Sequence, residues 1–101
     1  EVKRTPRNDL ATALRTARRG TGIAQEGFVG VSGRTYISQL ERGQRNATLS
    51  KVDELASVMG LHPATLVTLS YMSSPGSTAE LDKLLSRVRE EVIRLSAAGG
   101  T

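Results

Sequence analysis

Apolar residues recur at helical spacing along most of the chain, and glycine or proline separates one such stretch from the next. In residues 10–17 the apolar positions follow the i, i+3, i+4, i+7 order of one helix face, and similar stripes return in residues 49–59 and 81–95. No stretch alternates apolar and polar residues convincingly, as a half-buried strand does. The pattern predicts an all-α fold.

Turn and capping residues mark the expected ends of these helices. Gly20 follows the first stretch, Ser32-Gly33 supplies a turn before the third, and Gly43 closes the third. Thr48 is a suitable N-cap, and Pro63 suits a first helical position. The first expected helix begins between Thr5 and Asn8 and ends at Arg19. The others are Ala24–Val31, Arg34–Arg42, a helix between Thr48 and Gly60, one that begins at Pro63, and Thr78–Leu95.

All of the net positive charge lies in the first half of the chain. Residues 1–50 hold nine basic and four acidic side chains, a balance of +5, whereas residues 51–101 hold five and six, a balance of −1. A basic surface attracts the phosphates of a nucleic acid and releases counterions. An ordinary solvated surface explains a charge of this size equally well, so charge alone decides nothing.

The composition excludes several kinds of site. The chain has no cysteine, so disulfides and thiolate metal sites are excluded, and a reducing compartment fits. The one histidine, His62, makes a multi-histidine metal site implausible, and we expect it to be a surface or capping residue. Without a phosphate-cradling glycine motif or a convergent carboxylate pair, we expect no enzymatic activity, metal or cofactor. With neither a membrane-spanning apolar run nor a secretory signal, we expect a cytoplasmic protein.

The third expected helix carries a surface suited to reading base edges. Ile37 and Leu40 lie three residues apart and should face the interior. The remaining face presents arginine, which pairs with guanine, glutamine, which pairs with adenine, and hydroxyl groups that add single hydrogen bonds. Each side chain taken singly is more often plain solvated surface. As a set, the expected base contacts are Gly33, which leaves room for close approach, Arg34, Thr35, Ser38 and Gln39.

Three motifs follow one another through the middle of the chain: Gln25-Glu26, Ile37-Ser38-Gln39-Leu40-Glu41-Arg42-Gly43, and the Gly60–Pro63 junction. The last two lie within the string SGRTYISQLERGQRNATLSKVDELASVMGLHPATL, residues 32–66. Together they resemble the Cro/repressor-type (XRE) helix-turn-helix family over about residues 10–72. The resemblance implies a five-helix repressor-like DNA-binding domain that contains a helix-turn-helix, plus a C-terminal helix outside it.

The resemblance also implies phosphate contacts on both sides of the recognition helix. A helix start attracts phosphate through its N–H groups, and the polar loop after the recognition helix suits the opposite strand. The expected phosphate contacts are Arg18, Gln25, Tyr36, Arg42, Gln44, Arg45 and Asn46. Tyr36 alternatively packs against the second helix. Arg18 is also expected to form an ion pair with Glu41, which we interpret as structural and not catalytic.

The second expected helix departs from the family pattern. The segment from Gln25 to Tyr36 is about two residues shorter than in common members of the family. Gly27 and Gly30 each lower helix propensity by roughly 1 kcal/mol relative to alanine. Ala24 stands where a capping residue is usual. We therefore expect a tighter helix or turn here.

Two alternatives remain open for the C-terminal helix, which either packs back on its own domain or pairs with its copy in a second subunit. The apolar residues available for dimerisation are Leu81, Leu84, Leu85, Val88, Val92 and Leu95. The predicted division is a basic N-terminal arm (1–8), the helix-turn-helix domain (9–72), a linker (73–77), the C-terminal amphipathic helix (78–96) and a tail (97–101).

These features predict a sequence-specific, double-stranded DNA-binding transcriptional regulator of bacterial or phage type. We expect a repressor that acts as a homodimer on a palindromic operator, with half-sites about one helical turn (~34 Å) apart. The alternative is a protein-interaction module of antitoxin type, which uses the same fold to bind a toxin or another regulator.

Overall fold

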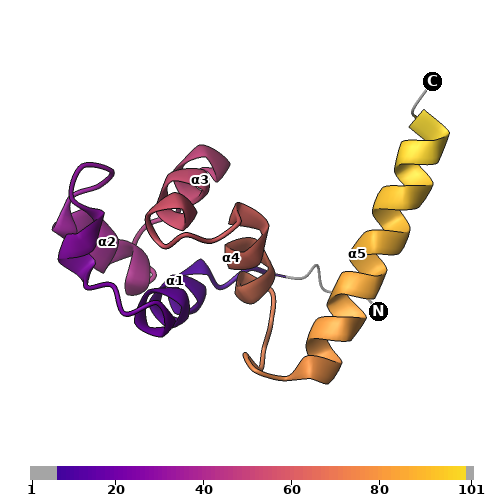
Figure 1. Ribbon diagram of the computed structural model, residues 1–101, viewed down its shortest axis with the longest axis horizontal. Coiled ribbons are helices and arrows are strands. Elements are labelled where there is room, and N and C mark those ends of the chain that lie inside the picture. The colour runs from indigo at the N-terminus through magenta and orange to yellow at the C-terminus, as the bar shows by residue number, and fades with distance from the viewer. Residues whose placement is uncertain (1–6, 100–101) are drawn as a thin grey trace. The chain divides into compact units, whose positions relative to one another are not determined.

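The computed structural model describes residues 7–99, and every regular element in that range is helical (Figure 1). The elements are α1 (Leu10–Gly20), the 3₁₀ helix η1 (Gln25–Phe28), α2 (Arg34–Glu41), α3 (Leu49–Val58), α4 (Pro63–Ser70) and α5 (Thr78–Gly99). The all-α prediction is therefore confirmed. The chain divides into two compact units, one up to Tyr71 and one from Met72 onward, so α5 belongs to the second unit.

The first helix begins later than the sequence predicted. Asp9 precedes α1, and its carboxylate accepts a hydrogen bond from the backbone N–H of Thr12 at 3.1 Å. Hydrogen bonding to Thr12 holds the pKa of Asp9 below its ordinary value. Residues 7–9 are not helical, so the predicted start at or before Asn8 is wrong, because the N-cap lies at Asp9. The expected arm lies outside the described residues except for Arg7 and Asn8.

The second helix is a single 3₁₀ turn and is shorter than the predicted Ala24–Val31. Ala24 precedes it without a side-chain cap. At Gly27 a Cβ would come within 2.6 Å of Ile23 Cγ2. Gly30 has a φ of 99°, a left-handed conformation that favours glycine. The two glycines therefore permit a tight turn, and they are not weak points of a longer helix.

α3 and α4 are capped by the residues expected from the sequence. The hydroxyl oxygen of Thr48 accepts a hydrogen bond from the N–H of Lys51 at 3.1 Å at the start of α3. His62 precedes α4, and its Nδ1 accepts from the N–H of Ala64 at 2.9 Å. Pro63 is the first residue of α4. The single histidine is thus a capping residue, as predicted.

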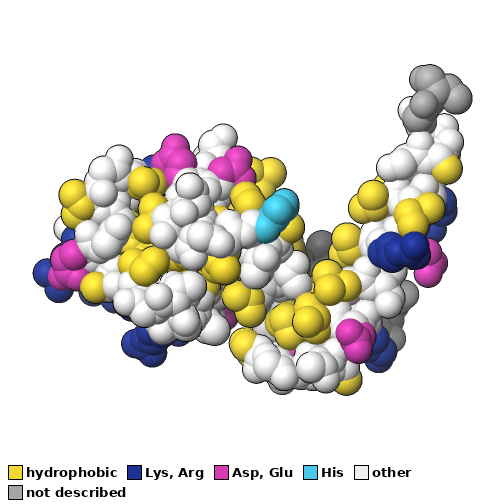
Figure 2. Space-filling view, viewed as in Figure 1, with side chains coloured by type: hydrophobic (Ala, Val, Ile, Leu, Met, Phe, Trp, Pro, Cys, Tyr) yellow, Lys and Arg dark blue, Asp and Glu magenta, His cyan; other side chains and the backbone are white. Residues whose placement is uncertain are grey.

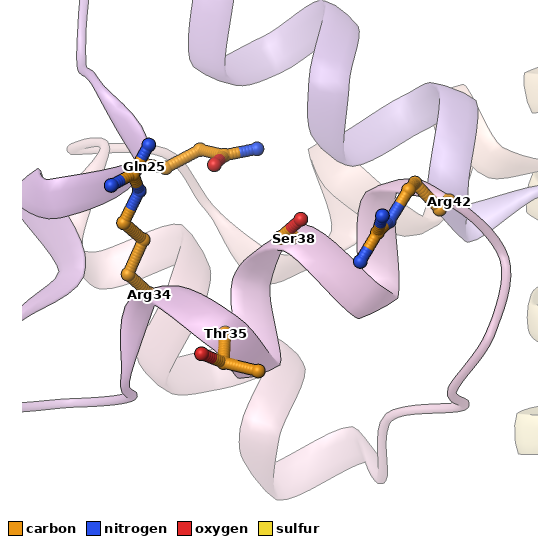
Figure 3. A pocket seen from close by; sticks show the side chains of 5 residues that line it. All are labelled: Gln25, Arg34, Thr35, Ser38 and Arg42. Carbon is orange, nitrogen blue, oxygen red and sulfur yellow. The ribbon is translucent and has the colours of Figure 1, made fainter.

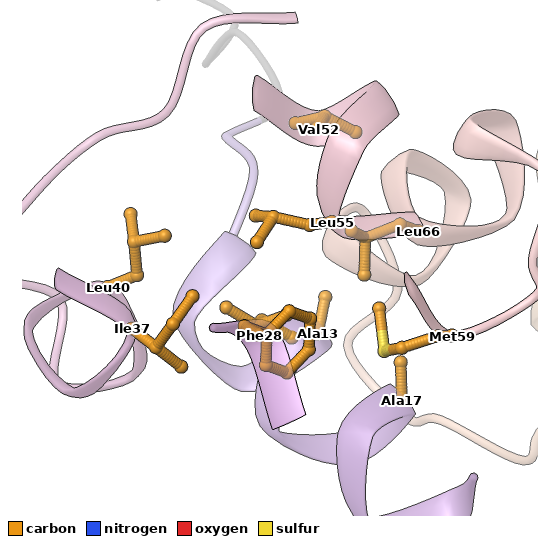
Figure 4. Packing of buried hydrophobic residues seen from close by; sticks show 10 residues of the cluster. Ala13, Ala17, Phe28, Ile37, Leu40, Val52, Leu55, Met59 and Leu66 are labelled. Atoms are coloured by element: carbon orange, nitrogen blue, oxygen red, sulfur yellow. The ribbon is translucent and has the colours of Figure 1, made fainter. Parts of the chain in front are cut away.

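One hydrophobic core joins the helices of the first unit (Figure 4). α1 packs against α4 and α2, α3 packs against α4, and η1 contacts α2 and α3. Burying each large apolar side chain contributes about 1.5–3 kcal/mol, so this core holds α2 firmly on the rest of the unit. The buried cluster consists of Ala13, Leu14, Ala17, Phe28, Ile37, Leu40, Val52, Leu55, Met59 and Leu66.

The second unit opens with a hydrogen-bonded turn onto α5. The hydroxyl of Ser77 accepts from the N–H of Glu80 at 3.2 Å. In return the Glu80 carboxylate accepts from the backbone N–H groups of Ser73 and Ser74, both at 2.8 Å, and from the Ser73 hydroxyl. These hydrogen bonds hold the pKa of Glu80 below its ordinary value, and those from the backbone N–H groups of Ser73 and Ser74 have the largest effect. They fix where α5 begins.

α5 continues past the predicted helix end at Leu95 and reaches Gly99. Residues 97–99, which we expected in a tail, are therefore helical, because no residue before them is a strong helix breaker. None of the residues of α5 is buried. No helix within residues 7–99 is long and apolar enough to cross a membrane.

Candidate nucleic-acid interface

α2 is held through its apolar face and presents a polar face outward. Ile37 and Leu40 are 0% and 1% exposed, so the predicted inward pair is confirmed. The opposite face carries the residues expected to contact bases. Gly33, Arg34 and Thr35 are exposed, and Ser38 and Gln39 are half-buried.

Gly33 is the N-cap of α2 and has open space around it. Its φ of −72° is one that any residue can adopt. A Cβ built at this position would meet nothing within 4 Å. Neither the backbone nor the packing of the protein therefore requires a glycine here.

A shallow hollow of about 240 Å³ lies where η1 meets α2 (Figure 3). It is lined by Gln25, Arg34, Thr35, Ser38 and Arg42. Figure 3 shows Thr35, Ser38 and Arg42 along α2, with the side chain of Arg34 reaching toward Gln25. Two guanidinium groups, two hydroxyls and an amide make this surface rich in hydrogen-bond donors. Such a surface suits phosphate oxygens and the acceptor atoms of bases.

A buried ion pair joins α1 to α2 behind this surface. Arg18 donates to Glu41 from Nε to Oε2 at 2.5 Å and from Nη2 to Oε1 at 2.9 Å, and Glu41 is only 4% exposed. Gln25 Nε2 donates to Glu41 Oε1 at 3.0 Å, and Arg15 Nη1 donates to the Glu41 carbonyl at 2.7 Å. The network thus ties α1, η1 and the end of α2 together.

The network also decides the charge of Glu41. Burial raises the pKa of its carboxyl, but the hydrogen bonds from Arg18 and Gln25 and the charges of Arg18 and Arg15 lower it by more. The pKa of Glu41 therefore lies below its ordinary value. The pKa of Arg18 lies above its own ordinary value, chiefly because of the hydrogen bond to Glu41. Both groups are charged at neutral pH.

Two of the residues predicted to contact phosphate take part in this network. Arg18 Nη1 also donates to the carbonyl of Ile23 at 3.1 Å, so all three guanidinium nitrogens are bound within the protein. Its side chain is 13% exposed. These contacts engage three of the five N–H groups of Arg18, so we assign it first to the ion pair and do not include it in the phosphate contacts proposed below. Gln25 is half-buried, and one of its amide hydrogens points to Glu41, so the other remains for an external acceptor.

Glu26 is a residue of this surface to which the sequence analysis gave no role. Its Oε2 lies 3.1 Å from Arg34 Nε, and the two side chains are 58% and 67% exposed. An ion pair this exposed contributes at most about 1 kcal/mol, so Arg34 can leave Glu26 for a base or a phosphate. The adjacency of Glu26 to Gln25 in the motif was the available signal, but only the fold places its carboxylate against Arg34.

Tyr36 and Gln39 are both contacted by Arg45 from the loop after α2. The guanidinium carbon of Arg45 lies 5.4 Å from the centroid of the Tyr36 ring, and Lys51 Nζ lies 5.6 Å from it. Arg45 Nε also donates to Gln39 Oε1 at 2.6 Å. One acceptor position of the Gln39 amide oxygen is thus taken by Arg45, while its NH₂ group stays available. Lys51 was not among the predicted site residues, since no sequence spacing connects it to Tyr36.

The remaining predicted site residues lie in two places. Arg42, Gln44 and Asn46 are exposed at the end of α2 and in the loop that follows it. The six apolar residues proposed for dimerisation are on α5, where none of them is buried. Within residues 7–99, no group of three or more His, Asp or Glu side chains could hold a metal ion.

The helices that form this surface match a known protein family. The sequence model of a family described as Helix-turn-helix matches residues 14–66. That segment is slightly more than half of the 101 residues. It includes both partners of the Arg18–Glu41 ion pair and the whole of α2.

Two curated proteins are similar to part of the chain. An uncharacterised HTH-type transcriptional regulator, y4dJ, of Sinorhizobium fredii is 43% identical over 53 residues, which cover 50% of this chain and 69% of that protein. The control protein C.BamHI of Bacillus amyloliquefaciens is 34% identical over 41 residues, which cover 41% of this chain and 51% of that protein. The chain thus matches about half the length of the control protein.

Two solved structures resemble the fold. The restriction-modification controller protein C.AhdI from Aeromonas hydrophila superposes with a TM-score of 0.53 and 32% identity, covering 57% of this chain and 91% of that one. A hypothetical transcription factor, NHTF, from Neisseria superposes with a TM-score of 0.54 and 30% identity, covering 66% and 82%. Both matches take in most of the solved chain and leave a third or more of this chain unmatched.

Proposed function

Because the chain belongs to the helix-turn-helix family of DNA-binding transcription regulators, we propose that it acts as a sequence-specific repressor, as a homodimer on a palindromic operator. Regulators of this family bind double-stranded DNA and are not enzymes. The observation that carries the proposal is the donor-rich outer face of α2, which stands exposed while Ile37 and Leu40 anchor the helix in the core. We further propose that the protein works in the cytoplasm, where it has access to promoter DNA.

In this proposal the first turns of α2 enter the major groove. Arg34 reads guanine through its two donor groups, and Thr35 and Ser38 add hydrogen bonds to base edges. Gln39 contributes its NH₂ group, since its oxygen is held by Arg45. Gly33 leaves room for the base edges to come close to the start of the helix, where a side chain would stand in open space.

Phosphate contacts flank the base contacts and fix the register of the protein on the duplex. The half-buried amide of Gln25 offers its remaining hydrogen on one side of α2. Arg42 and the loop after α2 approach the other strand, and the hydroxyl of Tyr36 reaches a phosphate beside Arg45. The full set of proposed phosphate contacts is Gln25, Tyr36, Arg42, Gln44, Arg45 and Asn46.

The dimer is proposed to form through the six apolar residues of the C-terminal helix named above, none of which is buried. A dimer places two recognition helices in successive major grooves about one helical turn (~34 Å) apart. The proposed division of the chain follows from these roles: a basic arm (1–8), a DNA-binding domain (9–72), a linker (73–77) and a dimerisation helix that continues to residue 99.

Selection of bound duplexes from random DNA, followed by affinity measurement on the selected site, tests this function. We expect a palindromic site, bound more weakly as salt rises because phosphate contacts release counterions. Arg34→Ala should weaken binding to the selected site by about 5- to 150-fold, the cost of a lost bidentate base contact. Arg94→Ala removes the same charge from α5, which belongs to the second unit, and serves as the control.

Binding of no duplex at ~50 mM salt, where electrostatic attraction is strong, would reject the proposal. The fold would then serve a protein partner, as in an antitoxin. Equal losses for Arg34→Ala and Arg94→Ala would instead reject the base-reading role of α2.

A further inference from the structure

α5 carries an apolar row with the spacing of a coiled-coil seam. Leu81, Leu85, Val88, Val92 and Leu95 follow one another at intervals of four, three, four and three residues. The last four are 45%, 46%, 55% and 64% exposed. Figure 2 shows hydrophobic side chains in a row along this helix. The exposed apolar row is thus two heptads long, and the start of α5 is fixed by the hydrogen bonds of Glu80 and Ser77.

We propose that α5 pairs with α5 of a second copy of this chain and that the two helices run antiparallel. The inference rests on the homodimer proposed above and adds the orientation and register of its interface. The observation that points to it is the placement of charge beside the seam. Asp82 and Arg89 lie seven residues apart on one flank, and Leu84 and Glu91 lie seven apart on the other.

In an antiparallel pair, side chains on equivalent flanks of the two helices face each other. Two antiparallel registers each bury four seam residues of both helices, and one of them sets Leu85 opposite Val88 of the second copy, and Leu81 opposite its Val92. In that register Asp82 faces Arg89 of the second copy, and the two-fold axis repeats this pair. Opposite charges therefore meet twice, beside the seam, where such pairs select partner and orientation.

Other arrangements of the same two helices lack this match. Sliding the antiparallel pair by one heptad in one direction brings the two Asp82 side chains together and uncovers part of the seam. Sliding it in the other direction opposes Arg89 to Arg89 and Glu91 to Glu91. A parallel pair sets Arg89 opposite Leu84 and Glu91 opposite Ser96, so it forms no ion pair across the seam. The charges are self-complementary in one arrangement, which favours a second copy as the occupant.

The orientation also suits a palindromic site. With a rise of 1.5 Å per residue, the two N-terminal ends of an antiparallel pair in this register lie about 25 Å apart. A parallel pair would bring these ends to within about 10 Å. Each end continues into a DNA-binding unit, and half-sites one turn apart require the recognition helices to be separated by ~34 Å. Antiparallel pairing therefore holds the points at which the two DNA-binding units join the helix pair well apart.

A charge swap in the full chain tests the inference. Sedimentation equilibrium at low salt, without DNA, should give a dimer for the unaltered chain. Asp82→Arg and Arg89→Asp should each weaken dimerisation by about tenfold or more, because each replaces two attractive contacts by two like-charge contacts. The double variant, Asp82→Arg with Arg89→Asp, should restore dimerisation. Glu90→Arg and Lys83→Asp make the same charge changes on the far side of the helix and should leave the dimer within about twofold of the unaltered chain.

An introduced cysteine provides a second measurement, because the chain has none of its own. Leu85→Cys combined with Val88→Cys should form disulfide-linked dimers, whereas Val88→Cys alone should not. A disulfide-linked dimer of Val88→Cys alone would overturn the orientation, since a parallel pair sets each residue beside its own copy.

Three further results would overturn the inference: a monomeric unaltered chain, single reversals no weaker than their controls, or a double variant that fails to recover. A helical circular dichroism spectrum for each variant shows that it is folded, so that a loss of dimer reflects weaker helix pairing and not unfolding. Because these measurements contain no DNA, they can show that α5 does not pair as proposed even if the protein binds duplex DNA. Duplex binding can also fail while the helix pair forms.

Discussion

Arg18 of α1 and Glu41 at the end of α2 form a bidentate ion pair, and their side chains are 13% and 4% exposed. It joins the helix that packs on α4 to the helix that faces outward. Gln25 and Arg15 complete the hydrogen bonding of Glu41. The orientation of α2 therefore depends on a charge that lies behind the proposed DNA surface.

Glu41→Ala should destabilise the fold by about 3 kcal/mol, because it leaves the buried guanidinium of Arg18 without its counter-charge. The free energy of unfolding from urea denaturation measures the loss. Glu54→Ala is the control, since the Lys51–Glu54 pair is more exposed and should contribute no more than about 1 kcal/mol. Unchanged stability together with weakened DNA binding would show that Glu41 is not a structural residue.

The same carboxylate should make stability depend on pH. The pKa of Glu41 in the folded protein lies below its ordinary value of 4.5, so the unfolded chain binds more protons as pH falls past that value. The stabilisation is complete above the ordinary value and is lost as pH falls through the folded pKa. Glu41→Gln, which cannot ionise, should flatten this dependence. Parallel acid-unfolding curves for the two proteins would contradict the assignment.

The sequence predicts the outward face of α2 well, because the two inward apolar residues and the shortness of the helix are enough to identify that face. Ile37 and Leu40 must face the core, and a short helix then has only one face left for its polar side chains. The prediction fails where a contact depends on tertiary geometry. Nothing in residue spacing brings Lys51 over Tyr36 or sets the Glu26 carboxylate against Arg34.

Gly27 in η1 and Gly30 just after it show that the backbone sets the same limit on prediction. Propensity treats Gly27 and Gly30 as weak points of a helix. In the structure they are required, because Gly30 has a positive φ and Gly27 lies against the stiff, branched side chain of Ile23. A propensity scale contains neither the backbone angle nor the neighbour.

Gly27→Ala should therefore destabilise the protein by about 1–3 kcal/mol, although alanine is the better helix former, because its Cβ would overlap Ile23 Cγ2. Gly20→Ala, at the end of α1, is the matched control. A Cβ there meets nothing within 4 Å, so this change should be neutral or slightly stabilising. Thermal unfolding of both variants makes the comparison, and equal stability would contradict the packing argument.

Glu26→Gln should strengthen DNA binding. The carboxylate holds Arg34 at 3.1 Å and places negative charge beside the hollow that phosphate is proposed to approach. Removing that charge should raise affinity by about two- to fivefold, with the larger gain at low salt where screening is weak. Glu90→Gln on α5 provides the same charge change far along the sequence as a control. Weaker binding by Glu26→Gln would instead indicate that Glu26 itself contacts a base, since a carboxylate accepts from cytosine.

Arg45 should determine which base Gln39 reads. Adenine recognition by glutamine uses the amide oxygen as acceptor and the NH₂ group as donor. In the structure Arg45 Nε occupies that oxygen at 2.6 Å, so Gln39 offers donors and should prefer the acceptors of guanine or thymine. Arg45→Ala frees the oxygen and should shift the selected base toward adenine at that one position, besides weakening binding overall. Arg42→Ala, which removes a charge without touching Gln39, should weaken binding with the base preference unchanged. Selection from random duplexes measures both effects, and an identical preference in the two variants would mean that Arg45 does not orient Gln39.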